Sequence, residues 1–209
     1  MEQGIVNPKA AGSSPAPGAH TLAEVSLIRD GISHPGTVNG RMAGSNTAGD
    51  ARINAFAQSV ELALAQAYGE LSNSGKVATP DAVDATSAFV AHHQQHAAAL
   101  GELAGSRATT TPNRRLATML TARVRNAPDE RAALEAALTF ENEAASTYLF
   151  ALGSLEATEA LQLSASILPV ESQHAVVLAT LLRKAPGETY PIFENQDQAF
   201  RPDEFPAPA

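Results

Sequence analysis

Two stretches of the sequence are copies of one pattern: His93-Gln94-Gln95-His96-Ala97-Ala98-Ala99-Leu100 and, 78 residues later, Glu171-Ser172-Gln173-His174-Ala175-Val176-Val177-Leu178. Four of the eight aligned positions are identical, which indicates one repeated unit. Side chains three positions apart lie on one face of a helix, so the first and fourth residues of each copy point the same way. The repeat therefore predicts two equivalent helices, each with a pair of candidate metal ligands on its inner face.

A second repeat relates two further segments, in which Glu61, Ala65 and Tyr68 recur as Glu141, Ala145 and Tyr148. Each position is offset by 80 residues, close to the offset of 78 in the first repeat. The Glu and the Tyr are seven residues apart, which is two helical turns, so they project from one face. The chain thus reads as two copies of a helix hairpin.

Start and stop signals divide the chain into four long helices and one short one. The first long helix covers residues 50–73, the second runs from Thr79-Pro80-Asp81 to Gly105, the third begins at Pro128-Asp129-Glu130, and the fourth runs from about residue 158 to 183. A shorter basic segment that begins at Thr111-Pro112 and ends near Asn126 predicts an accessory helix in a long crossover. Pro169 is expected to kink the fourth helix.

The regions outside the helices differ in composition from the rest. Residues 1–48 are rich in Gly, Pro and Ser and are interpreted as a low-complexity N-terminal arm. Residues 186–209 combine prolines with Tyr190, Phe193, Phe200 and Phe205, which predicts an extended strap that lies on the bundle or on a partner. The expected organisation is an all-α four-helix bundle over residues 50–185 with an extended tail at each end.

Composition limits the classes of function. The chain has 209 residues with 44% hydrophobic and 5% aromatic residues, and it is rich in alanine, which suits one close-packed helical domain. A net charge of −8 argues against nucleic acid and anionic lipid as partners. With no Cys, any metal must bind to nitrogen and oxygen. No apolar run is long enough to span a membrane, so we expect a cytoplasmic protein, although an exported chain that has lost its signal would look the same.

Six residues of the two repeats are the candidate metal ligands: Glu61, His93, His96, Glu141, Glu171 and His174. Carboxylates and imidazoles suit Fe, Mn or Zn, and charged groups in a helical core are costly unless a metal or one another compensates them. Two positions have alternatives, because His92 rather than His93, and Glu143 rather than Glu141, are open as the inward residue. The repeats favour His93 and Glu141.

With these residues in place, the chain resembles the ferritin-like superfamily, specifically the actinobacterial ferritin-like proteins of the rubrerythrin or di-iron carboxylate type. In that family the first and third helices each give a Glu, and the second and fourth each give Glu-x-x-His. The resemblance implies that Glu61 and Glu141 are the single carboxylates. It further implies a ligand pair at Glu171 and His174, and His96 as the second-helix imidazole. His93 departs from the family pattern, which has a carboxylate there.

The resemblance implies a non-haem di-iron oxidase or ferroxidase that reacts Fe(II) with dioxygen or peroxide, with Mn or Zn as other metals and a homodimer as a candidate assembly. The alternative is a ferritin-like structural or stress-related binding protein without redox activity, whose site is mononuclear, holds zinc or is empty. His93 favours this alternative somewhat, because it removes one negative charge. We expect Tyr68 and Tyr148 to pack in the core with satisfied hydroxyls rather than to act in catalysis.

Overall fold

The computed structural model describes residues 47–189 and 195–208. Its long helices are α2 (Ala48–Asn73), α3 (Pro80–Ala104), α4 (Arg114–Asn126), α5 (Glu130–Leu152) and α6 (Thr158–Leu181). Two single turns, η1 (Gly105–Arg107) and α7 (Pro186–Thr189), complete the helical elements. These residues contain no strand, so the predicted all-α class is confirmed. The expected arm up to residue 46, with Tyr190 and Phe193, lies outside the described residues.

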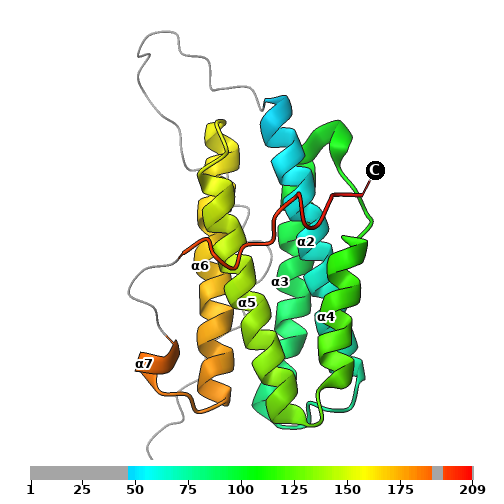
Figure 1. Ribbon diagram of the computed structural model, residues 1–209, viewed down its shortest axis with the longest axis vertical. Coiled ribbons are helices and arrows are strands. Elements are labelled where there is room, and N and C mark those ends of the chain that lie inside the picture. The colour runs from blue at the N-terminus through cyan, green and yellow to red at the C-terminus, as the bar shows by residue number, and fades with distance from the viewer. Residues whose placement is uncertain (1–46, 190–194, 209) are drawn as a thin grey trace, which may run out of the picture. The chain divides into compact units, whose positions relative to one another are not determined.

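Four of the long helices form the bundle, and α4 is the accessory helix in the crossover, as predicted. In Figure 1, α2 and α6 descend while α3 and α5 rise. Helix α4 descends along the outside of α2, which returns the chain to the lower end of the bundle before α5 begins. Because of this crossover, α2 is antiparallel to α5 and α3 is antiparallel to α6.

The upper end of the bundle is fastened by Asp50. Thr47 and Asp50 form a capping box at the start of α2, in which the Asp50 amide donates to Oγ1 of Thr47 at 3.1 Å. The Asp50 carboxylate also accepts from the amides of Glu156 at 2.9 Å and Ala157 at 3.2 Å. One buried carboxylate thus caps α2 and ties it to the start of α6.

Apolar side chains close the core one helical turn above and below the ligand positions. On one side lie Ala57, Leu100 and Ile167, each four residues from Glu61, His96 or Glu171 on its own helix. On the other side the larger cluster includes Leu64, Phe89 and Leu178. The polar ligands therefore form a layer between two dry zones, in which a charge without a partner would be costly.

Pro169 does not interrupt α6, which runs continuously from Thr158 to Leu181. A proline inside a helix lacks the amide that would bond to the carbonyl four residues earlier, here that of Ala165. Both Ala165 and Pro169 are exposed, so water can satisfy that carbonyl. The predicted helix four therefore begins at Thr158 and includes the proline.

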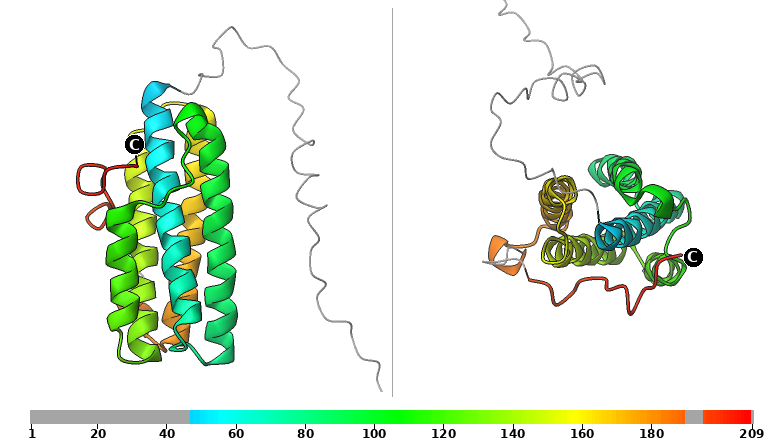
Figure 2. Two further views of the ribbon diagram at one scale, coloured as in Figure 1. Left: turned by 90° about the vertical axis from the view of Figure 1, so that its right-hand side faces the viewer. Right: turned by 90° about the horizontal axis from the view of Figure 1, so that it is seen from above.

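The described part of the C-terminal segment, residues 195–208, crosses the outside of the bundle over α5 and α4 (Figure 2). Phe200 and Phe205 are buried, and the Phe200 amide donates to Oγ1 of Thr147 at 2.8 Å. The side-chain amide of Asn113, which is itself fully buried, donates to the carbonyls of Phe205 at 3.0 Å and Pro206 at 3.1 Å. These contacts attach the segment to the bundle.

Candidate metal centre

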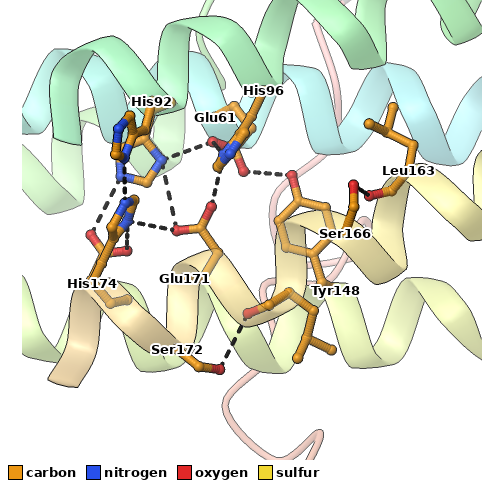
Figure 3. A network of polar contacts seen from close by, with 12 residues as sticks. Glu61, His92, His96, Tyr148, Leu163, Ser166, Glu171, Ser172 and His174 are labelled. Carbon is orange, nitrogen blue, oxygen red and sulfur yellow. Dashed lines mark hydrogen bonds and ion pairs between the residues drawn. The ribbon is translucent and has the colours of Figure 1, made fainter. Parts of the chain in front are cut away.

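All six predicted ligands meet in the middle of the bundle. Glu61 comes from α2, His93 and His96 from α3, Glu141 from α5, and Glu171 and His174 from α6. Five of them are at most 3% exposed, and the side chain of His96 is 14% exposed. Figure 3 shows imidazoles and carboxylates from these helices converging.

The first group of ligand atoms joins α2, α3 and α6. Nδ1 of His93 lies 2.8 Å from Oε2 of Glu61, within hydrogen-bonding distance. Nδ1 of His96 lies 2.9 Å from Oε1 of Glu171 and 3.5 Å from Oε2 of Glu61. Two carboxylates and two imidazoles therefore enclose this half of the site.

The second group joins α3, α5 and α6. Nδ1 of His174 lies 3.1 Å from Oε2 of Glu141 and 3.3 Å from Oε2 of Glu171. Nε2 of His93 lies 3.4 Å from Oε1 of Glu141. This half again has two carboxylates and two imidazoles, and it shares His93 and Glu171 with the first.

Both groups have dimensions close to those of a metal site. Within each group, one ligand atom per residue lies within 4.8 Å of the others. Opposite ligands of one ion are about 4.2 Å apart when each bond is about 2.1 Å, so the spacing of either group is close to what one ion requires. The shared residues face both halves, since Glu171 turns Oε1 to His96 and Oε2 to His174. Each group is therefore a candidate site for a metal ion.

Atoms without hydrogen bonds support the fit to a metal. Both oxygens of Glu171 and Nδ1 of His96 are buried and have no hydrogen-bond partner in the structure. Oε1 of Glu171 and Nδ1 of His96 are only 2.9 Å apart, yet their orientation does not make a hydrogen bond. Atoms that are close but not directed at each other suit coordination of a third atom, and buried polar atoms without partners otherwise cost about 1–3 kcal/mol each.

Comparison with known protein families matches the part of the chain that forms the bundle. The model of a family described as "Ferritin-like domain" matches residues 49–184. The chain belongs to the ferritin-like domain family. Searches of curated proteins and of solved structures found no match. The match covers all four bundle helices and the crossover, and with them every candidate ligand of the ferritin-like domain.

The carboxylates of this ferritin-like domain differ in their electrostatics. Burial alone would raise the pKa of Glu61, but the hydrogen bond with His93 and the close contact with His96 outweigh burial and lower the pKa to about 2. The pKa of Glu141 is lowered for the same kind of reason, with His93 and His174 as its partners. Burial and the nearby charge of Glu61 raise the pKa of Glu171. Glu171 is thus the carboxylate least compensated by the protein.

The histidines supply positive charge when no metal is bound. Burial opposes protonation of His96, but the contacts with Glu171 and Glu61 raise its pKa to about 9. The pKa values of His93 and His174 are also raised, against the effect of burial, by their carboxylate neighbours. These shifts favour the protonated imidazoles beside the carboxylates, and a metal ion that binds there competes with those protons.

The structure decides between the alternative inward residues. His93 is fully buried, whereas His92 is exposed and its Nδ1 lies 2.8 Å from Nε2 of His174. Glu141 is fully buried, whereas Glu143 turns outward and pairs with Arg123 at 3.0 Å. The contact between His92 and His174 cannot be predicted from the sequence repeats, because it depends on how α3 and α6 pack.

Two tyrosines donate hydrogen bonds to the carboxylates of Glu61 and Glu141. The hydroxyl of Tyr68 donates to Oε1 of Glu141, and the hydroxyl of Tyr148 donates to Oε1 of Glu61 at 2.5 Å. Burial and the adjacent carboxylates raise the pKa of both phenols well above the usual value, so they remain protonated donors. Both hydroxyls are satisfied, and both orient a candidate ligand.

Within the described residues, none of the helices combines the length and the apolar character that a membrane-spanning segment requires.

Proposed function

We propose that this ferritin-like domain is a non-haem di-iron oxidase of the ferroxidase type. The observation that carries the proposal is the pair of buried ligand groups that share His93 and Glu171, each with its atoms within 4.8 Å. Fe(II) is the substrate: two Fe(II) ions give one electron each to hydrogen peroxide, which takes up two protons and yields two Fe(III) and two water molecules. With dioxygen as the oxidant, the same two electrons and two protons yield peroxide.

The residues of the site favour the oxidised product through charge. Glu61, Glu141 and Glu171 bring three negative charges into a dry layer, where they interact with cations more strongly than in water. Oxidation adds one positive charge per iron, so the carboxylates stabilise Fe(III) more than Fe(II). Because His93 replaces a carboxylate of the family pattern, this preference is weaker than in a site with four carboxylates.

The donor set also admits other metals. Carboxylate oxygens and imidazole nitrogens bind Mn and Zn as well as Fe. We therefore propose iron as the working metal on the strength of the paired geometry, with Mn or Zn as competitors.

Iron oxidation by purified, untagged protein tests the proposal. Fe(II) is added without oxygen, peroxide or air is then admitted, and Fe(III) formation is followed by near-ultraviolet absorbance. The matched variants are Glu171→Gln, which removes the shared carboxylate with little change of shape, and Glu143→Gln, which removes a carboxylate paired with Arg123 outside the site. We expect Glu171→Gln to slow oxidation at least about tenfold and Glu143→Gln to change it less than about twofold. Oxidation no faster than in protein-free buffer would overturn the proposal.

A second function is favoured by one specific observation. In the absence of metal, the carboxylates of Glu61 and Glu141 contact imidazoles of raised pKa, which offset their charge without any ion. This supports a non-redox ferritin-like structural or stress-related protein whose site is empty, mononuclear or occupied by zinc. On this alternative, Zn(II) binds at one ion per chain, iron oxidation does not exceed the protein-free rate, and Glu171→Gln retains the cellular role.

A further inference from the structure

A cavity of about 790 Å³ lies at the upper end of the bundle, away from the six candidate ligands. Its walls are the first turns of α2, η1 with the two residues that follow it, and residues of the C-terminal segment. We call it the C-terminal cavity, and it is defined here by Arg52, Ile53, Phe56, Arg107, Pro202 and Pro208. None of the metal-centre residues lines it. Its volume is typical of sites for small organic ligands.

Positive charge without a partner marks this cavity. Arg52 and Arg107 are exposed, and neither has a hydrogen bond or an ion pair to any residue that the structure describes. No Asp or Glu is among the lining residues. By contrast, Arg123 pairs with Glu143 and Arg125 pairs with Glu70 on the neighbouring helix α4. In a chain of net charge −8, two uncompensated guanidinium groups on one cavity favour an anion there.

The remaining lining is largely apolar. Ile53 and Phe56 of α2 line it together with Pro202 and Pro208 of the C-terminal segment. A free inorganic ion would leave this surface unused, whereas an apolar chain attached to the anionic group would bury it. The combination of two cations and an apolar lining on one cavity therefore favours an amphipathic ligand.

Internal hydrogen bonds hold both walls in place. On one side, the amide of Thr109 donates at 2.8 Å to Oε1 of Gln58, a buried residue of α2. On the other side, Asn113 holds the carbonyls of Phe205 and Pro206, and the guanidinium of Arg115 donates to the carbonyl of Glu204 at 2.7 Å. The cavity is thus formed before any ligand arrives, which lowers the entropic cost of binding.

We propose that the C-terminal cavity binds a small anionic amphiphile, with its carboxylate or phosphate between Arg52 and Arg107 and its apolar chain against Ile53 and Phe56. Guanidinium groups bind both kinds of anion through paired hydrogen bonds. This site is separate from the metal centre, and binding requires neither metal nor oxidation.

Calorimetric titration of the full chain with octanoate and with octyl phosphate tests the proposal, and octylammonium is the control of opposite charge. We expect one anion per chain with a Kd below about 1 mM, which corresponds to at least about 4 kcal/mol, and no binding of octylammonium. Tighter binding of one anion identifies whether the head group is a carboxylate or a phosphate. Absence of saturable binding of both anions would overturn the proposal.

Matched variants locate the site. The double variant Arg52→Gln/Arg107→Gln removes both charges at exposed positions, and Arg183→Gln is the control, since Arg183 is an exposed arginine beyond the end of α6. We expect the double variant to weaken octanoate binding at least about tenfold and the control to change it less than about twofold. A second variant, Ala108→Phe, places a ring in the cavity from an exposed lining position and should abolish binding. Unchanged binding in both variants would show that octanoate binds elsewhere.

Discussion

The hydroxyl of Tyr148 on α5 donates a 2.5 Å hydrogen bond to Oε1 of Glu61 on α2. Tyr68 on α2 donates in return to Glu141 on α5. The seven-residue spacing of Glu and Tyr corresponds to about 10.5 Å on both helices, and the helices are antiparallel. Each phenol therefore reaches the carboxylate of the other helix. In Glu61 this leaves Oε2 facing His93 and His96.

Removal of one phenol should affect both stability and metal binding. Tyr148→Phe leaves Oε1 of Glu61 buried without its donor, which we expect to lower the free energy of unfolding of the metal-free protein by about 1–3 kcal/mol. It should also weaken Mn(II) or Fe(II) binding by about tenfold, because the hydroxyl orients the ligand. Thermal unfolding and anaerobic metal titration measure the two effects.

The control for this variant is Thr180→Val, which removes a hydroxyl that bonds only to the carbonyl of Val176 on its own helix. We expect it to change stability by less than about 0.5 kcal/mol and to leave metal binding unaltered. If Tyr148→Phe bound metal as tightly as the control, Tyr148 would have only a packing role.

Replacement of His93 by Glu should lower the stability of the metal-free protein and raise its affinity for metal. The variant His93→Glu restores the carboxylate of the family pattern, so the site then carries four carboxylates in a fully buried layer. Without metal we expect a loss of about 3 kcal/mol or more, because one positive partner is replaced by a like charge. With metal we expect tighter binding of a second ion, measured as two Mn(II) per chain by calorimetry and elemental analysis.

Gln94→Glu provides the comparison, since it adds a carboxylate one residue along α3 at an exposed position. It should alter neither stability nor stoichiometry appreciably. A second Mn(II) ion that binds no more tightly in His93→Glu than in the unmodified chain would contradict the assignment of His93 as a residue shared by two ions.

The pH dependence of the metal-free protein follows from two shifted pKa values. The pKa of His96 rises on folding from 6.5 to about 9, so its stabilisation is complete below pH 6.5 and is lost as the pH rises to about 9. The pKa of Glu61 falls from 4.5 to about 2, so its stabilisation is present above pH 4.5 and is lost as the pH falls to about 2. The metal-free protein should therefore be most stable between about pH 4.5 and 6.5.

Melting temperatures at pH 5.5, 7.5 and 9 test this dependence. The first pH lies inside the window of about 4.5 to 6.5, and the other two lie above it. From His96 we expect a loss of about 2 kcal/mol between the first and the last, or roughly 4–8 °C. Saturation with Mn(II) should remove the loss, because the metal takes the place of the protons. A metal-free melting temperature that rises with pH over this range would contradict the charge balance proposed for the site.

The repeats predict much of the site because equivalent positions of a repeat lie on the same face of their helices. His93 was preferred over His92, and Glu141 over Glu143, only because each occupied the repeated position, and the structure buries both preferred residues. The spacing of Glu and Tyr likewise placed each pair on one face. Local periodicity is set by the helix itself and can be read without knowledge of neighbours.

Features that depend on how helices face one another could not be predicted in this way. The exchange of Tyr68 and Tyr148 between carboxylates requires α2 and α5 to be antiparallel and in register. The contact of His92 with His174 and the C-terminal cavity arise from packing between distant segments. Pro169 lies inside α6, which continues through it, since its solvent side tolerates a missing hydrogen bond.

Asn113 offers a test of how the C-terminal segment is held. Its Oδ1 accepts from the amide of Leu116 at 3.1 Å and so caps α4, while its Nδ2 donates to the carbonyls of Phe205 and Pro206. Asn113→Ser keeps a capping oxygen but loses the Nδ2 amide that reaches the two carbonyls, whereas Asn113→Ala loses both. Hydrogen exchange and melting temperature separate the two roles.

We expect both variants to release the amides of residues 199–205 to faster exchange. Only Asn113→Ala should lose about 1 kcal/mol more, as its cap disappears. Protection of that segment in Asn113→Ser equal to that of the unmodified chain would show that Phe200 and Phe205 hold it without Asn113.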